Sequence, residues 1–246
     1  MELAKLLDIR PGVTAAVGSG GKTTLLRTLG EELARAGHTV LLCTTTKIFP
    51  FDGLPCARTE EELEKLRRKH RLLCAGTPYL DTGKLTALSV PMAALAERFD
   101  YVLAEADGSA QRPLKAHAAH EPVIPPEVRR IVCVVGLSGL GVPIEEAAHR
   151  PELYADLAGV SVQTPVTAEI AATVLRREER GWRFFINQAD TPERWAWGRE
   201  LASLLPGGAI VGSLQKGACF SCLLCYGEPE IWPPALPCGC GEAISG

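Results

Sequence analysis

A glycine-rich turn followed by a lysine and two threonines carries the residue types most suggestive of chemistry. Backbone N–H groups in such a turn, with the positive end of the helix that follows, face the phosphates of a nucleotide. Lys22 would reach the β- and γ-phosphates, and Thr23 would place its hydroxyl on Mg²⁺. The sequence therefore predicts a P-loop that binds ATP or GTP with Mg²⁺. The residues of this turn are Gly18, Ser19, Gly20, Gly21, Lys22, Thr23 and Thr24.

The turn is an abbreviated form of the P-loop. The full pattern has a glycine five positions before Gly21, where this chain has Ala16. The match is to the shorter form Gly-x-x-Gly-Lys-Thr-Thr, as in the Mur-ligase group, and the alternative is an ordinary strand-to-helix turn with a chance lysine. Because the turn follows an apolar strand and opens an amphipathic helix, we favour the phosphate site.

Two acids that end a later apolar strand are the expected partners of the turn. Glu105 closes the strand, and Asp107 points the same way if the chain stays extended. One acid would hold Mg²⁺ through water, and the other would orient the attacking group. The alternative is one functional acid and one loop cap. We predict Thr23, Glu105 and Asp107 as Mg²⁺ ligands, and Lys22, Glu105, Asp107 and Lys115 as catalytic residues.

Two further segments supply polar groups near the expected nucleotide. Thr45, Thr46 and Lys47 leave the second strand and suit a switch-like segment that senses the γ-phosphate, although threonine also favours strands for its own sake. Arg112 and Lys115 would neutralise phosphate charge.

The same basic segment contains His117, His120 and Glu121. A metal or proton-transfer site is one interpretation. The separation of three residues differs from the His-Glu-x-x-His spacing, so we expect the histidines to lie in a solvated loop.

A late strand ends in a sequence that resembles the Asn-Lys-x-Asp motif of guanine recognition. Asn187 and Asp190 match it, and Gln188 stands where lysine is expected. Asp190 would accept hydrogen bonds from the guanine base. The alternative is a strand-to-helix turn with Asp190 near an N-cap, so the base stays open between ATP and GTP.

The nine cysteines are unevenly distributed. Cys43, Cys74 and Cys133 lie in apolar runs and are expected to be buried thiols. Five others crowd into a Pro- and Gly-rich tail, which we expect not to continue the sheet. Their spacing suits Zn²⁺ or an iron–sulfur cluster. The alternative is a disordered tail with redox-labile thiols. A further interpretation is that the thiols carry a soft chalcogen such as selenium. The tail cysteines are Cys219, Cys222, Cys225, Cys238 and Cys240.

Strand and helix patterns alternate along the chain, which predicts an α/β fold with a mostly parallel sheet and helices on both faces. Ligands then bind at the carboxyl ends of the strands. We expect a nucleotide-binding domain over 1–216 and the Cys-rich tail over 217–246. The expected strands are 13–17, 39–43, 71–75, 101–105, 130–136, 182–186 and 209–211, with helices over 22–36, 60–69, 91–98, 167–177 and 192–205 and a hairpin or lid turn at 81–84.

Composition excludes several classes of protein. The 26 basic and 29 acidic residues give a net charge of −3, without a basic stripe for nucleic acid. No apolar run reaches the roughly 20 residues of a membrane span, and no leader peptide is visible. We therefore expect a cytoplasmic protein that binds neither nucleic acid nor membrane.

Six motifs follow one another in the chain: V-G-S-G-G-K-T-T-L-L, T-T-T-K, A-E-A-D-G-S-A-Q-R-P-L-K-A-H-A-A-H-E-P-V-I-P, V-V-G-L-S-G-L-G-V-P, H-R-P-E and I-N-Q-A-D. Together they resemble the selenium-dependent hydroxylase accessory protein family, called YqeC, over residues 13–211. The resemblance implies a P-loop protein that helps to mature molybdenum hydroxylases requiring labile selenium. It carries over Gly18, Gly21, Lys22, Thr23, Thr24, Glu105, Asp107, Gly108, Arg112, Lys115, Glu121, His149, Arg150 and Pro151. The chain departs from it at Gln188 and in the Cys-rich tail.

Three hypotheses of function follow. The first is an NTP-hydrolysing maturation factor whose partner is a molybdenum hydroxylase or its selenium and molybdenum cofactor machinery. The second is a small-molecule kinase or ATP-dependent ligase. The third is a thiol- and metal-binding module in which the nucleotide is structural.

Overall fold

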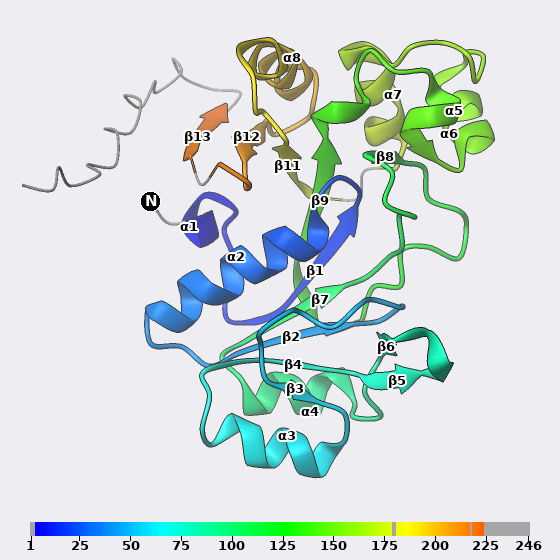
Figure 1. The fold of residues 1–246 in the computed structure, drawn as a ribbon. Coiled ribbons are helices and arrows are strands. Elements are labelled where there is room, and N and C mark those ends of the chain that lie inside the picture. The colour runs from blue at the N-terminus through cyan, green and yellow to red at the C-terminus, as the bar shows by residue number, and fades with distance from the viewer. Residues whose placement is uncertain (1–2, 179–180, 217, 224–246) are drawn as a thin grey trace, which may run out of the picture.

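The computed structural model describes residues 3–178, 181–216 and 218–223 (Figure 1). The strands of its main sheet are β1 (Gly12–Gly18), β2 (Val40–Thr44), β3 (Cys56–Ala57), β4 (Leu72–Ala75), β7 (Tyr101–Glu105), β9 (Val128–Gly136), β11 (Arg183–Asn187), β12 (Ala209–Ser213) and β13 (Ala218–Leu223). Their order is β13-β12-β11-β9-β1-β7-β2-β4-β3. All neighbours pair in parallel except β12 and β13, which are antiparallel.

Two small ribbons stand beside the main sheet. One pairs β8 (Leu114–Lys115) with β10 (Ala148–His149), and the other is the hairpin of β5 (Thr77–Tyr79) and β6 (Lys84–Thr86). The helices are α1 (Leu3–Leu6), α2 (Lys22–Arg35), α3 (Glu60–Arg67), α4 (Met92–Arg98), α5 (Ile144–Ala147), α6 (Pro151–Ala158), α7 (Ala168–Glu178) and α8 (Pro192–Ser203), with short 3₁₀ turns at Leu80–Thr82 and Leu137–Gly139.

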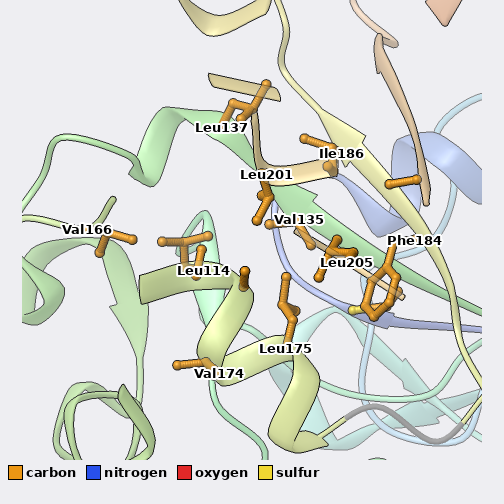
Figure 2. Packing of buried hydrophobic residues seen from close by; sticks show 14 of the residues in the cluster. Leu114, Val135, Leu137, Val166, Val174, Leu175, Phe184, Ile186, Leu201 and Leu205 are labelled. Carbon is orange, nitrogen blue, oxygen red and sulfur yellow. The ribbon is translucent and has the colours of Figure 1, made fainter. Parts of the chain in front are cut away.

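Helices cover both faces of the sheet. One face packs against α1 and α2, and its core includes Leu25, Leu29 and Phe185. On the other face, α3 and α4 cover the half around β2 and β4, while α5 to α8 cover the half around β9 and β11. Figure 2 shows part of that last core, where Val135, Ile186 and Leu205 gather with the other labelled side chains. The apolar strands are thus buried from both sides, which is the pattern that a parallel sheet requires.

The predicted α/β fold is confirmed. The expected strands and helices are present, with ends shifted by a few residues, and the expected turn at 81–84 lies in the β5–β6 hairpin. Cys43, Cys74 and Cys133 are buried thiols, as expected. In the part of the chain that the structure describes, every helix falls short of the length and apolarity needed to cross a bilayer.

The expectation that the sheet ends before Gly217 is wrong. Residues 218–223 form β13, which pairs antiparallel with β12 and extends the sheet by one edge strand. Two features of the sequence hid this strand. Residues 217–246 are rich in Cys, Pro and Gly, and the five apolar residues among 218–223 do not alternate with polar ones.

Candidate functional site

Residues 18–21 of the glycine-rich turn join the end of β1 to α2, which begins at Lys22 and contains the last three residues of the turn. Gly18, Gly20 and Gly21 have φ values of 86°, 87° and 126°, a region that side-chain-bearing residues rarely adopt. A Cβ on Gly20 would lie 2.4 Å from the Cα of Gly136, and one on Gly21 would lie 2.4 Å from Asn187 Nδ2. Glycine is therefore required both for the backbone conformation and for the close packing around the turn.

Lys22 is held under the turn by three oxygen partners. Its Nζ donates to the carbonyl of Gly18 at 2.7 Å and lies 3.0 Å from Asp107 Oδ1 and 3.7 Å from Glu105 Oε1. The side chain is 3% exposed. These contacts with two carboxylates and one carbonyl fix the position of the Lys22 side chain under the turn.

Glu105 ends β7 beside the first turn of α2. Its Oε2 accepts a hydrogen bond of 2.8 Å from Thr23 Oγ1. Burial raises the pKa of Glu105 above its usual value, and the neighbouring charge of Asp107 adds to this, against the opposing effects of Lys22 and Thr23. A hydroxyl and a carboxylate in contact are hard oxygen donors of the kind that Mg²⁺ prefers.

Asp107 has a different environment although only one residue separates it from Glu105. It is fully buried, and its Oδ2 accepts a 2.8 Å hydrogen bond from the backbone N–H of Gly18. Burial by itself would raise the pKa of Asp107. The hydrogen bond with His117 and the charges of Lys22 and Lys115 outweigh burial and hold this pKa at about 2. Asp107 is thus ionised at neutral pH, and its hydrogen bond with Gly18 fixes the turn.

His117 lies between two carboxylates. Its Nε2 is 2.7 Å from Asp107 Oδ2, and its Nδ1 is 2.8 Å from Glu178 Oε2. Glu178 also accepts from the backbone N–H of His117 at 2.6 Å. Burial alone would lower the pKa of His117, but the hydrogen bonds with Asp107 and Glu178 outweigh it and raise the pKa. The expectation of a solvated loop is wrong for His117, which is 6% exposed at its side chain, and correct for the exposed His120.

Lys115 contacts the same oxygen of Asp107 as His117 does. Its Nζ lies 3.2 Å from Asp107 Oδ2 and 2.8 Å from Glu121 Oε2, and it also donates to the carbonyl of Gly108. Arg150 Nη1 lies 2.5 Å from the same oxygen of Glu121. We call Asp107, Lys115, His117, Glu121 and Glu178 the buried charge cluster.

A cleft of about 670 Å³ opens above the turn at the carboxyl edge of the sheet. This volume is in the range of pockets that bind small molecules and cofactors. The cleft faces Lys22, Thr23 and Glu105, whereas the buried charge cluster lies outside its walls. Five basic and two acidic residues line it: Lys22, Arg27, Lys47, Lys84, Arg112, Asp52 and Glu105.

Some of the residues predicted to bind the nucleotide line the cleft, and others do not. Lys47 and Arg112 line the cleft. Thr45 and Thr46 are absent from its walls: Thr45 Oγ1 donates to the carbonyl of Val123 at 2.8 Å, and the backbone N–H of Thr46 donates to Thr44 Oγ1 at 2.9 Å.

Asn187 and Asp190 lie at the end of β11 and have separate roles. Asn187 Nδ2 donates to the carbonyl of Gly20 at 2.8 Å, so it fixes the backbone of the turn. Asp190 accepts from Ser213 and lies 3.5 Å from Arg194. Thr191, rather than Asp190, caps α8. The cleft wall contains neither of the two but includes Gln188.

The sequence did not indicate three residues that line the cleft or belong to the buried charge cluster. Phe49 lines the cleft and is 56% exposed, with Lys84 Nζ 5.1 Å from its ring centroid. Lys84 arrives from the β5–β6 hairpin, and Glu178 arrives from the end of α7. Phe49 lies two residues after Lys47, the last residue of the predicted switch-like segment, and that proximity was an available signal. Glu178 lies 61 residues from its partner and had none.

The tail cysteines are only partly within the structure. Cys219 and Cys222 fall in β13, and Cys225, Cys238 and Cys240 lie outside the described residues. Over 3–178, 181–216 and 218–223, His, Cys, Asp and Glu do not gather in groups of three or more suited to a metal ion. The predicted zinc or iron–sulfur site is therefore untested.

Two comparisons relate the chain to known proteins. A family model described as YqeC protein matches residues 14–152. The protein called Uncharacterized protein YqeC, from Escherichia coli (strain K12), is 33% identical over 183 residues, which cover 71% of this chain and 71% of that protein. The match of the family model contains the turn, Glu105 and four of the five residues of the buried charge cluster, and ends before Glu178.

Proposed function

The chain belongs to the YqeC protein family, and we propose that it binds a nucleoside triphosphate with Mg²⁺ in the cleft and turns it over. The observation that carries the proposal is the arrangement around Lys22. Its ammonium group, the Thr23 hydroxyl and the Glu105 carboxylate meet at the open end of a turn built from glycine.

The residues of the site fit both expected ligands. The backbone N–H groups of the turn and the start of α2, with Lys22, would hold the phosphates. Thr23 and Glu105 would hold Mg²⁺, which supplies charge neutralisation at the phosphate oxygens. The excess of five basic over two acidic residues in the walls favours a polyanion. The raised pKa of Glu105 records the burial of an acid that a cation would compensate.

The order of the strands supports one orientation of the nucleotide. Lys22 and Glu105 mark the γ-phosphate end, and Glu105 ends β7, which lies between β1 and β2. The γ-phosphate would therefore face the segment after β2. Ser138 and Gln188, which line the cleft beyond β9 and β11, would lie nearer the base.

Within this scheme, the buried charge cluster supports the turn and does not touch the nucleotide. Asp107 holds the N–H of Gly18, and Lys22 reaches the same carboxylate. We assign Lys115 and His117 the role of keeping Asp107 ionised and oriented. The predicted catalytic role of Lys115 becomes a positioning role in this proposal.

Family membership also suggests the pathway. We propose that nucleotide turnover serves the maturation of selenium-dependent molybdenum hydroxylases, with such a hydroxylase or its cofactor machinery as the partner. The tail thiols are candidates for carrying a soft metal or selenium in that process.

A binding measurement tests the nucleotide site directly. Titration of the full chain with ATP and with GTP, each with and without Mg²⁺, should give Mg²⁺-dependent saturation for one or both. Lys22→Ala should weaken the binding at least 100-fold, a size expected for loss of a charged donor at a phosphate. Lys65→Ala, an exposed lysine of α3, is the matched control and should bind like the wild type.

The proposal fails if neither nucleotide binds to wild-type protein that is folded by circular dichroism. Binding without turnover under all tested partners would reduce the proposal to a structural nucleotide in a thiol- and metal-binding module.

A second candidate, a small-molecule kinase or ATP-dependent ligase, is favoured by the far wall of the cleft. Lys47, Phe49 and Lys84 lie on the side that the γ-phosphate would face. A ring with two lysines suits a planar, anionic acceptor. This candidate predicts nucleotide consumption in a fixed ratio to one added acceptor, whereas a maturation factor predicts turnover that responds to a partner protein.

A further inference from the structure

Cys56 and Cys74 form a pair of thiols that the proposed function does not use. They are directly opposite each other on the neighbouring parallel strands β3 and β4. Residues opposite each other in a sheet point to the same face, and neighbouring strands lie about 4.8 Å apart. That spacing falls within the range of about 4.4–6.8 Å between the Cα atoms of a disulfide.

The two thiols already interact. Cys56 and Cys74 belong to the same core cluster under α2, with Cys74 buried and Cys56 only partly covered. The hydrogen bond with the Cys74 thiol lowers the pKa of Cys56, and the charge of Arg58 contributes. The same hydrogen bond raises the pKa of Cys74, as does burial. The accessible sulfur is thus the more readily ionised one, as expected of an attacking thiol beside a resolving thiol.

We infer that Cys56 and Cys74 are a redox-active pair that closes to a reversible disulfide. A low-molecular-weight disulfide is the oxidant. The Cys56 thiolate attacks one of its sulfurs and expels a thiolate, forming a mixed disulfide. The Cys74 thiolate then attacks Cys56 Sγ and expels the second small thiolate. Two protein thiols become one disulfide, the small disulfide becomes two thiols, and the two protein protons pass to the leaving thiolates.

The position of the pair gives the reaction a structural consequence. β3 is the two-residue edge strand at the end of the main sheet. The chain between β2 and β3 supplies Lys47, Phe49 and Asp52 to the cleft. Cys74 already contacts that segment, because its N–H donates to the carbonyl of Pro55 at 2.8 Å. A bond between Cys56 and Cys74 would fasten the end of this cleft-lining segment to the inner strand β4.

Peptide mapping tests the inference without relying on nucleotide binding. The reduced full chain is incubated with oxidised glutathione, free thiols are alkylated, and the protein is digested with trypsin without reduction. Cleavage at arginine and lysine releases Cys56 in peptide 48–58 and Cys74 in peptide 72–84, each with one cysteine. We expect these two peptides to appear joined, with a mass lower than their sum by two hydrogen atoms, and to separate again with dithiothreitol.

The digest holds its own control, because Cys43 lies alone in peptide 36–47 on the buried strand β2. That peptide should stay unlinked, whereas Cys56→Ser and Cys74→Ser should each abolish the joined product. Hydrogen exchange at 48–55 should slow on oxidation in the wild type and stay unchanged in Cys56→Ser. The inference is overturned if both peptides are recovered alkylated, if Cys56 retains glutathione, or if it joins a tail cysteine as the main product.

Discussion

The cleft and the buried charge cluster use the same short stretch of chain in opposite ways. Glu105 and Asp107 are separated by one alanine, yet Glu105 faces the cleft with a raised pKa while Asp107 is fully buried with a pKa of about 2. The difference lies in their partners. Asp107 is surrounded by Lys22, Lys115, His117 and the N–H of Gly18.

This contrast distinguishes two kinds of buried acid. A carboxylate surrounded by several cations of the protein stabilises structure, and one with less positive charge around it is available for a ligand. Asp107 is of the first kind. Glu105, with Thr23 as its hydrogen-bond partner and Lys22 at 3.7 Å, is of the second. Substitutions at the two acids should therefore differ in their effects on stability and on activity.

The largest effect is expected from Asp107→Asn. The change removes the anion that faces two lysines and a histidine, and breaking a buried ionic group costs about 3–5 kcal/mol. For a chain of this length that corresponds to a fall in Tm of roughly 10 °C. Asp156→Asn, on the exposed side of α6, is the matched control for thermal unfolding. A loss below about 1 kcal/mol would mean that the cluster does not hold the turn.

Glu105→Gln should have the reverse profile. It relieves the cost of burying a charge, so the free energy of unfolding should change by no more than about 1 kcal/mol. Nucleotide turnover should fall by roughly 100-fold or more, the usual loss when a charged group at the reacting centre is removed. Thermal unfolding and single-turnover kinetics on the same preparation check both. Equal losses of stability in the two variants would erase the contrast between the acids.

The pH dependence of stability should reveal His117. Its pKa is raised in the folded state, so its stabilising contribution is complete below about 6.5 and is lost as the pH rises through the folded value. Asp107 has a lowered pKa, so its contribution persists until the pH falls from 3.8 towards about 2. Urea unfolding between pH 6 and pH 9 should show declining stability in the wild type.

His117→Gln supplies the comparison for that experiment. The variant should be less stable at the acidic end and should show a flatter decline, because no imidazolium is left to titrate. An NMR titration of the wild-type imidazole gives the folded pKa independently. A value below that of free histidine would contradict the two-carboxylate environment.

The smallest effect is expected from Phe49→Ala. The ring is 56% exposed, so stability should change by no more than about 0.5 kcal/mol. Nucleotide affinity should stay close to that of the wild type, because the base is proposed to lie near Gln188. A loss of affinity of about tenfold, the size of one lost stacking contact, would place the base at Phe49 instead.

The sequence was sufficient for the features set by local pattern. Alternating apolar strands and amphipathic helices predicted the parallel sheet, and Gly18, Lys22 and Thr23 could be assigned to one turn because their spacing is local. Glu105 was placed correctly at the end of a buried strand for the same reason.

The features set by long-range contacts could not be predicted in this way. His117 follows a run of residues that resembles a surface loop. Its burial is favoured by hydrogen bonds with Asp107, which lies nearby in the chain, and with Glu178, which lies 61 residues later. Lys84 enters the cleft because a hairpin folds back over the segment after β2. Residues 218–223 form a strand by pairing with the edge of β12. Such an edge supplies hydrogen bonds to almost any extended sequence, so the sequence of 218–223 gives little indication of the strand.

The hydrogen bond from Asn187 to Gly20 spans 167 residues of the chain, and this has a consequence for synthesis. At about 5–20 residues per second, the ribosome completes the Gly-Lys-Thr segment roughly 10–30 seconds before Asn187 is added. The strands that flank β1 also come later, at 101–105 and 128–136. A nascent chain that stops short of residue 187 therefore contains every residue of the turn but lacks the Asn187 amide that hydrogen-bonds to it. Such a chain should gain nucleotide affinity only as β11 emerges.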